Sequence, residues 1–182
     1  MNVKDILSSY NDLIFSDDSE TKLNDLKSLI SEKSIDNKLF VFGNGGSAAI
    51  ADHFAVDMTK NASVKTLSMN NSSMITCLSN DYGYSEWMKK CLEFYAKEND
   101  IVFLISSSGN SQNVVNAAKF CKLNNIKAIT FTGFDKTNSL KACGDLNFWV
   151  NSQSYNIVEN IHQIWLLTLV DLIIGKIVYP AS

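Results

Sequence analysis

The chain has 182 residues, of which 46% are hydrophobic and 19% charged, so it can form one ordinary globular domain but not two. The formal net charge is -3, and all 16 basic residues are lysines. A mildly acidic chain without arginine lacks the basic patch on which nucleic-acid affinity depends, so we expect no nucleic-acid partner.

The four cysteines are scattered and include no CxxC pair, which favours reduced thiols over disulfides or a zinc site. The first 20 residues never build the apolar core of a signal peptide. The most apolar stretch, 164–174, is interrupted by Thr168 and Asp171 and is too short to span a bilayer. These features predict a soluble, cytoplasmic protein with no membrane partner.

In chain order, two helical segments come first, within residues 1–35. Apolar residues recur at helical spacing from Val3 to Tyr10 and again from Leu23 to Ile30. From residue 36 the pattern changes to short apolar runs that end in glycine or polar residues, which are typical of buried strands. The runs are 38–42, 65–69, 101–105, 127–132 and 146–150, and helical patterns occupy 47–60, 85–97, 111–123 and 156–175.

Strands that alternate with helices indicate βαβ units and a parallel sheet covered on both faces. We therefore predict an α/β fold with a doubly wound, five-stranded parallel sheet, in one domain spanning residues 1–182 with N-terminal helices packed outside it. In such sheets ligands bind at the carboxyl ends of the strands.

The first strand ends in a glycine-rich loop, 43–47, that leads into a helix. Its glycines allow close backbone approach, Ser47 can cap the helix, and the helix N-terminus favours an anion. It is not a dinucleotide fingerprint, because Ala48 replaces the third glycine, and it lacks the lysine of a Walker loop. The alternatives are a phosphate site and a tight turn without a ligand.

A second loop, 106–111, also lies between a strand and a helix and reads Ser-Ser-Ser-Gly-Asn-Ser. Its hydroxyl groups can donate to phosphate oxygens without a cation, in keeping with the absence of arginine. A polar turn capped by Ser111 is the alternative. Because the two loops lie at the same edge of the predicted sheet, a shared phosphate site is favoured for both.

The only two histidines each lie near an acid on a predicted helix. His53 precedes Asp57 by four residues, and Glu159 precedes His162 by three, so each pair shares a helix face. If the pairs converge, they form a ligand set for zinc or a similar divalent ion, or an acid/base set beside a carbonyl. Ordinary ion pairs on helix surfaces have the same spacing.

Four segments together resemble the phosphoheptose (sedoheptulose 7-phosphate) isomerases of the sugar isomerase, or SIS, domain family. They are Phe42-Gly-Asn-Gly-Gly-Ser-Ala-Ala followed by Asp52-His-Phe-Ala, Ser79-Asn-Asp-Tyr-Gly-Tyr, Ser106-Ser-Ser-Gly-Asn-Ser and Val158-Glu-Asn-Ile-His. The resemblance implies a flavodoxin-like SIS fold, assembled as a homotetramer with active sites between subunits. It also implies aldose–ketose isomerisation of sedoheptulose 7-phosphate to D-glycero-D-manno-heptose 7-phosphate, for lipopolysaccharide or another surface glycan.

By the same resemblance, one set of residues binds substrate, with the serines on the phosphate and Asp81 at the sugar. The set is Asn44, Gly45, Ser47, Asp81, Ser106, Ser107, Ser108, Ser111 and Glu159. A divalent ion, zinc in some family members, is expected on His53, Asp57, Glu159 and His162. Asp57 would remove the proton next to the carbonyl, and His162 or a metal-bound water would return it at the neighbouring carbon.

The chain departs from the family pattern at the acid/base positions. Asp57 stands where the family has glutamate, Glu159 where it has glutamine, and Leu167 where it has a histidine, a role that His162 would have to take over. Two alternatives therefore stand beside the heptose isomerase: a non-catalytic SIS protein that binds a phosphosugar or a partner, and an isomerase of a different sugar phosphate. The apolar face of the last helix belongs either to the core or to a contact between subunits.

Overall fold

Five parallel strands form a single sheet in the order β2-β1-β3-β4-β5 in the computed structural model, which describes residues 2–16, 18–32 and 36–180. The strands are β1 (Leu39–Phe42), β2 (Thr66–Ser68), β3 (Ile101–Ser106), β4 (Lys127–Thr132) and β5 (Leu146–Trp149). All four neighbouring pairs are parallel, with Leu39 opposite both Thr66 and Ile101. The predicted α/β class, strand number and strand direction are confirmed.

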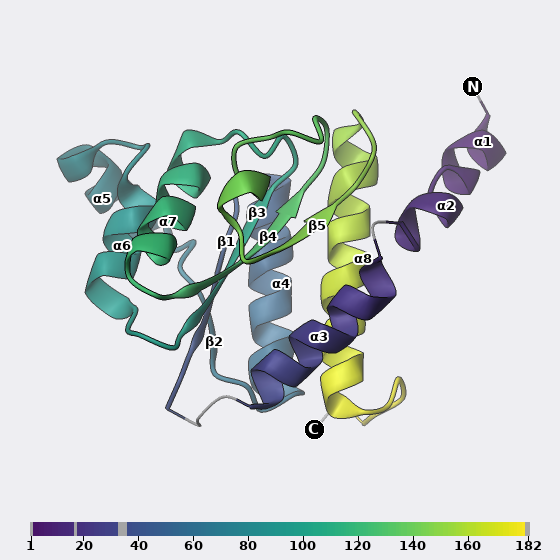
Figure 1. Ribbon diagram of the computed structural model, residues 1–182, viewed down its shortest axis with the longest axis horizontal. Coiled ribbons are helices and arrows are strands. Elements are labelled where there is room, and N and C mark those ends of the chain that lie inside the picture. Colours follow the sequence, from purple (N-terminus) through teal and green to yellow (C-terminus); the bar gives the residue numbers. More distant parts are fainter. Residues whose placement is uncertain (1, 17, 33–35, 181–182) are drawn as a thin grey trace.

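Helices cover both faces of this sheet (Figure 1). One face packs against α3 (Ser19–Ser31), α4 (Gly46–Lys60) and α8 (Tyr155–Ile174), and the other against α5 (Ser72–Tyr82), α6 (Trp87–Tyr95) and α7 (Gln112–Leu123). Successive strand residues point to opposite faces, so Val41 joins the first core and Phe40 the second. Apolar residues on both faces explain why the strands are continuous apolar runs.

The N-terminal helices differ in part from the prediction. The first helical pattern is divided into α1 (Val3–Ser8) and α2 (Asn11–Ile14), neither of which has a buried residue. Figure 1 shows α1 reaching away from the sheet, and its Val3 and Leu7 are largely exposed. The second pattern forms α3, whose Leu23, Leu26 and Ile30 are buried as its spacing predicts. The predicted boundary at residues 35 and 36 touches positions outside the described residues.

Helix α5 has no counterpart in the predicted elements. It begins with an Asn71 side chain that accepts hydrogen bonds from the backbone N–H groups of Ser73 and Met74, and Leu78 is its one buried residue. A helix that buries so little leaves almost no apolar periodicity in the sequence. A short 3₁₀ helix, Lys141–Cys143, is a further unpredicted element between β4 and β5.

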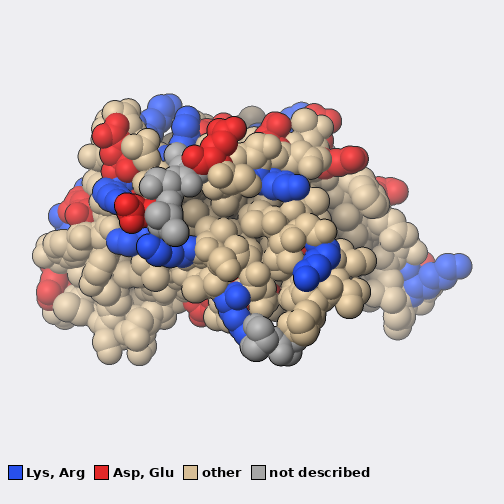
Figure 2. Space-filling view, turned by 90° about the horizontal axis from the view of Figure 1, so that it is seen from below, with Lys and Arg blue, Asp and Glu red and all other residues tan. Residues whose placement is uncertain are grey.

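Helix α8 is the long apolar helix of the chain. Its length and composition alone would allow it to cross a membrane. However, its side chains at Trp165, Leu166 and Leu169 are buried in the core that α3 and α4 share with the sheet. This is the environment of a core helix, which is one of the two alternatives that the sequence left open for this apolar face. The face of the molecule seen in Figure 2 carries both lysine and acidic side chains, with uncharged residues over much of its lower part.

Candidate active site

A small polar pocket lies where β1 and β3 end, at the edge of the sheet where the sequence places its two loops. Its volume is about 110 Å³. The lining residues are Asn44, Ser47, Ile105, Ser106, Ser107, Ser108, Ser111, Tyr155 and Glu159. None of them is lysine, arginine or histidine, so hydroxyl, amide and backbone groups supply the hydrogen-bond donors.

The β1–α4 loop needs its glycines for conformation and for space. Gly45 has a φ of 54°, in the left-handed region that favours glycine, and α4 begins at the next residue. A Cβ on Gly43 would overlap the backbone of Ser47, which is itself buried. The first turn of α4 is thereby drawn tightly against the end of β1 and directs its free N–H groups toward the pocket edge.

Three backbone hydrogen bonds hold the β3–α7 loop in place. The Gly109 N–H donates to the Ser106 carbonyl at 2.9 Å, and the Ser107 and Gly109 carbonyls accept from the N–H groups of Gly133 and Leu140 at 2.9 and 2.8 Å. Within the loop the Ser106 hydroxyl donates to the Ser111 hydroxyl at 3.2 Å. The backbone is therefore fixed, and the serine hydroxyls can turn toward an anion.

A reciprocal amide pair ties the two loops together. The Asn44 amide donates to Asn113 Oδ1 at 3.0 Å, and the Asn113 amide donates to Asn44 Oδ1 at 2.9 Å. The Tyr84 hydroxyl donates to the same Asn44 oxygen at 3.0 Å. Sequence reasoning missed Asn113, although an asparagine on the apolar face of α7 beside Val114 is a usable signal, because a buried amide needs partners. Tyr155 was also missed.

His53 and Asp57 lie together but outside this pocket. His53 Nε2 is 3.3 Å from Asp57 Oδ2, and its Nδ1 is 3.3 Å from the Gln163 amide of α8. About half of the His53 side chain is exposed. Because α4 rises about 1.5 Å per residue, Asp57 lies roughly 16 Å along the helix from Gly46, with which α4 begins beside the pocket residue Ser47.

His162 does not belong to the site, and the catalytic and metal-ligand roles predicted for it are wrong. Its ring is fully buried against Phe131 and Trp165, and Nε2 contacts the Thr132 carbonyl at 3.1 Å. Burial lowers the pKa of His162 to about 4. A neutral imidazole enclosed by the core cannot reach a substrate or an ion at the surface.

The other predicted residues divide between the pocket and the surface. Glu159 lines the serine pocket, where Ser107 Oγ donates to its Oε1 at 3.4 Å, and so points away from the predicted ion. Asp81 lies on α5, accepts from the Asn80 amide at 2.9 Å, and is not among the pocket residues. Within residues 2–16, 18–32 and 36–180, no group of three His, Cys, Asp or Glu side chains could hold a metal ion.

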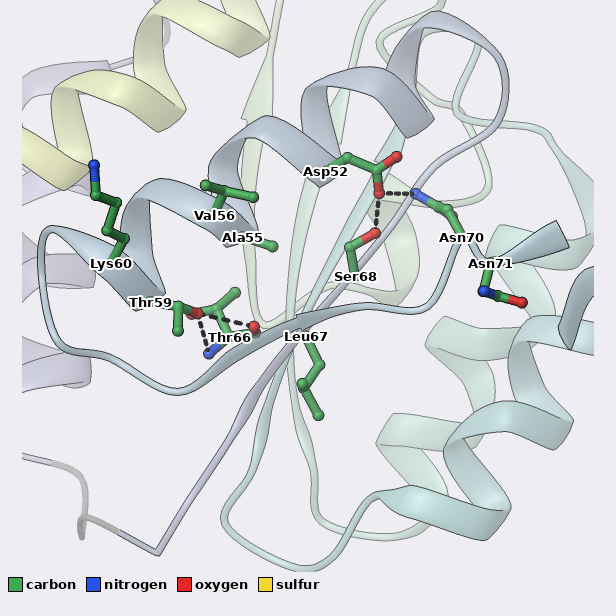
Figure 3. A pocket seen from close by; sticks show the side chains of 10 residues that line it. All are labelled: Asp52, Ala55, Val56, Thr59, Lys60, Thr66, Leu67, Ser68, Asn70 and Asn71. Carbon is green, nitrogen blue, oxygen red and sulfur yellow. Dashed lines mark hydrogen bonds between the residues drawn. The ribbon is translucent and has the colours of Figure 1, made fainter. Parts of the chain in front are cut away.

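A larger groove of about 630 Å³ runs beside α4 and the edge strand β2 (Figure 3). At its upper end Asp52 accepts hydrogen bonds from Ser68 and Asn70, and at its lower end the Thr59 hydroxyl bonds both backbone groups of Thr66. These contacts occupy the free edge of the sheet. The groove contains none of the predicted site residues.

Comparison with known proteins agrees with this fold. The family model for the SIS domain matches residues 14–133. A probable phosphoheptose isomerase of Thermoplasma acidophilum is 38% identical over 148 residues, 78% of each chain. The phosphoheptose isomerase of Aliarcobacter butzleri is 34% identical over 143 residues, 75% of each chain.

Two solved structures share the fold at 24% identity. A phosphoheptose isomerase from Neisseria gonorrhoeae superposes with a TM-score of 0.81 over 94% of this chain and 99% of that one. One from Francisella tularensis gives 0.80 over 97% and 100%. The doubly wound sheet is thus that of a SIS domain. Within that class, the chain belongs to the phosphoheptose isomerase family.

Proposed function

We propose that the protein isomerises sedoheptulose 7-phosphate to D-glycero-D-manno-heptose 7-phosphate, as a cytoplasmic step toward a surface glycan such as lipopolysaccharide. The observation that supports this most is the pocket lined by Ser106, Ser107, Ser108 and Ser111 beside Asn44 and Ser47. Hydroxyl groups and the N-termini of two helices, α4 and α7, meet there, which suits the phosphate of a sugar phosphate.

The chemistry requires a base beside carbon 1 of the ketose. We assign this role to Asp57, whose carboxylate takes the proton from carbon 1 to leave an enediol and, as the acid, returns it to carbon 2. His53, 3.3 Å from Asp57, is the group of this chain that can move the second proton from the oxygen on carbon 1 to that on carbon 2. With His162 buried, no second imidazole takes part.

We further propose that a homotetramer completes each site. In one chain Asp57 is too far along α4 to act on a sugar whose phosphate lies in the serine pocket. Apolar side chains are also exposed on the helices around His53, at Val56 of α4, Ile164 of α8 and Leu7 of α1. Packing another copy over these helices would cover the apolar surface. It would also bring the His53–Asp57 pair of one copy to the serine pocket of another.

Binding of zinc stays a prediction, and the residues of one chain form a poor ligand set for it. Only His53 and Asp57 of the four expected ligands lie together, with the Gln163 amide as their neighbour. Bound zinc would polarise the substrate oxygens. Metal analysis of the purified protein, before and after treatment with a chelator, tests whether an ion is held.

The test of the isomerase is to incubate the protein with sedoheptulose 7-phosphate, with and without zinc, and to follow the anomeric proton of the aldose product by NMR. Asp57→Asn should lower kcat at least 100-fold while the Kd for the sugar phosphate stays within about twofold, because the base is lost and the pocket is intact. Asp25→Asn, which removes an exposed carboxylate from α3, is the matched control.

Two outcomes would contradict this reading. Loss of binding together with turnover in Asp57→Asn would assign Asp57 a structural role. Binding of the sugar phosphate without any product would favour the second candidate, a phosphosugar-binding protein, or a different sugar phosphate as substrate. The binding-protein alternative is favoured by buried His162 and by Leu167, an apolar residue one turn beyond Gln163 on α8.

The proposed homotetramer is tested by measuring the molar mass of the protein in solution by light scattering, with four copies expected.

A further inference from the structure

The Glu159 carboxylate lies inside the pocket assigned to the phosphate. It accepts a hydrogen bond from Ser107 and packs so closely on Gly46, at the start of α4, that a Cβ on Gly46 would overlap its Oε2. A carboxylate at a helix N-terminus is a favourable arrangement, because the free N–H groups there carry partial positive charge. The chain thus places an anion of its own on the donors that a phosphate needs.

A phosphate bound in this pocket would lie against the Glu159 carboxylate. The free volume of about 110 Å³ is the space that the Glu159 side chain itself borders. No cationic side chain lines the pocket to offset two like charges at close range, where the low dielectric of a half-enclosed site strengthens their repulsion. This repulsion favours departure of the carboxylate when a phosphate monoester binds.

The side chain has a place to go. Glu159 also lines a neighbouring hollow of about 640 Å³ between α1 and the start of α8. Ser9, Asn156 and Asn160 offer polar groups there, and Asp5 adds a like charge that opposes the move. The Glu159 side chain can therefore rotate from the pocket into this hollow, and the like charge of Asp5 makes the rotation cost free energy.

We propose that Glu159 is a specificity-determining residue: its carboxylate occupies the phosphate subsite of the free protein and is displaced when a phosphate monoester binds. Affinity for phosphate is lowered by the cost of this displacement, whereas groups that bind outside the subsite are unaffected. The proposal rests on the function proposed above, because it takes the serine pocket as the phosphate subsite.

Calorimetric titration with inorganic phosphate tests this directly, at fixed pH and ionic strength, with EDTA present so that divalent ions cannot bridge the two anions. Glu159→Gln keeps the size of the side chain and removes its charge, and it should lower the Kd for phosphate at least tenfold. Glu159→Ala should bind at least as tightly as Glu159→Gln. Glu98→Gln, an exposed residue in the connection before β3, removes the same charge away from the pocket and should leave the Kd unchanged.

The outcomes separate the two proposals. Equal phosphate affinity in the wild type and both variants would overturn the role of Glu159 and leave the phosphate subsite standing. Weaker binding in Glu159→Gln, with a wild-type circular dichroism spectrum, would also overturn it and make Glu159 a contributor to binding. No phosphate binding by any of the proteins would remove the subsite itself, and both proposals with it.

Discussion

At the scale of single residues, the pocket depends on side chains that orient one another. Asn44 can present its remaining N–H to a ligand only while its amide plane is fixed, and Asn113 and Tyr84 fix it. Asn113 is 3% exposed, and its oxygen also accepts the N–H of Val114 at 3.0 Å. It therefore acts on the site through Asn44, as a positioning residue.

Asn113→Ala should weaken sugar-phosphate binding about tenfold and lower the free energy of unfolding by about 1–3 kcal/mol, because Asn44 loses its partner and its polar groups are left partly unpaired. Calorimetry and urea unfolding measure the two effects. Asn124→Ala, at the exposed C-cap of α7 and far from the pocket, should leave the affinity unchanged. Unchanged affinity in Asn113→Ala would show that Asn44 keeps its orientation without this bond.

At the scale of elements, the site exists because β1 and β3 are neighbours in the sheet. Their parallel register brings both loops and the N-termini of α4 and α7 to one edge. Each loop uses a glycine with positive φ, Gly45 at 54° and Gly109 at 65°. Their surroundings differ, because a Cβ on Gly109 would overlap the buried Asn138 side chain, whereas a Cβ on Gly45 meets nothing within 4 Å.

Gly109→Ala should therefore lower the free energy of unfolding by at least about 2 kcal/mol and abolish phosphate binding, since both the backbone and Asn138 must shift. Gly45→Ala has only the backbone strain, with no neighbouring side chain to displace, and should cost less. Thermal and urea unfolding of the two variants measure the difference. Equal costs would mean that the Asn138 side chain moves aside freely.

At the scale of the whole molecule, His162 links the stability of the fold to pH. Burial lowers its pKa to about 4, below the ordinary 6.5 that applies in the unfolded chain. The unfolded chain therefore binds the proton more strongly than the folded one. Its contribution to stability is complete above about pH 6.5 and is lost as the pH falls toward 4.

His162→Phe should remove this dependence. A phenyl ring suits neighbours such as Phe131 and Trp165, and the Thr132 carbonyl still accepts the N–H of Val150 at 2.9 Å. The free energy of unfolding of the wild type, measured relative to this variant, should fall by about 3 kcal/mol between pH 7 and pH 4. Urea unfolding across this pH range measures it, and parallel curves for the two proteins would contradict the assignment.

The sequence by itself determined the α/β class, the parallel strands and the two polar loops. Apolar runs such as Ile101–Ile105 can be satisfied only inside a sheet covered on both faces, and glycine or serine at their ends marks the edge where ligands bind. These features are local, because each depends on residues that are close together in the sequence.

Only the tertiary structure decided which polar side chains meet. Spacing on a helix fixes which residues share a face but not what that face packs against, so His162 on α8 looked like a ligand and lies in the core. For the same reason Glu159 joined the serine pocket rather than His53, and the Asn44–Asn113 pair went unforeseen. Contacts between residues far apart in sequence depend on how helices rotate against the sheet, and the packing of the whole core sets that rotation.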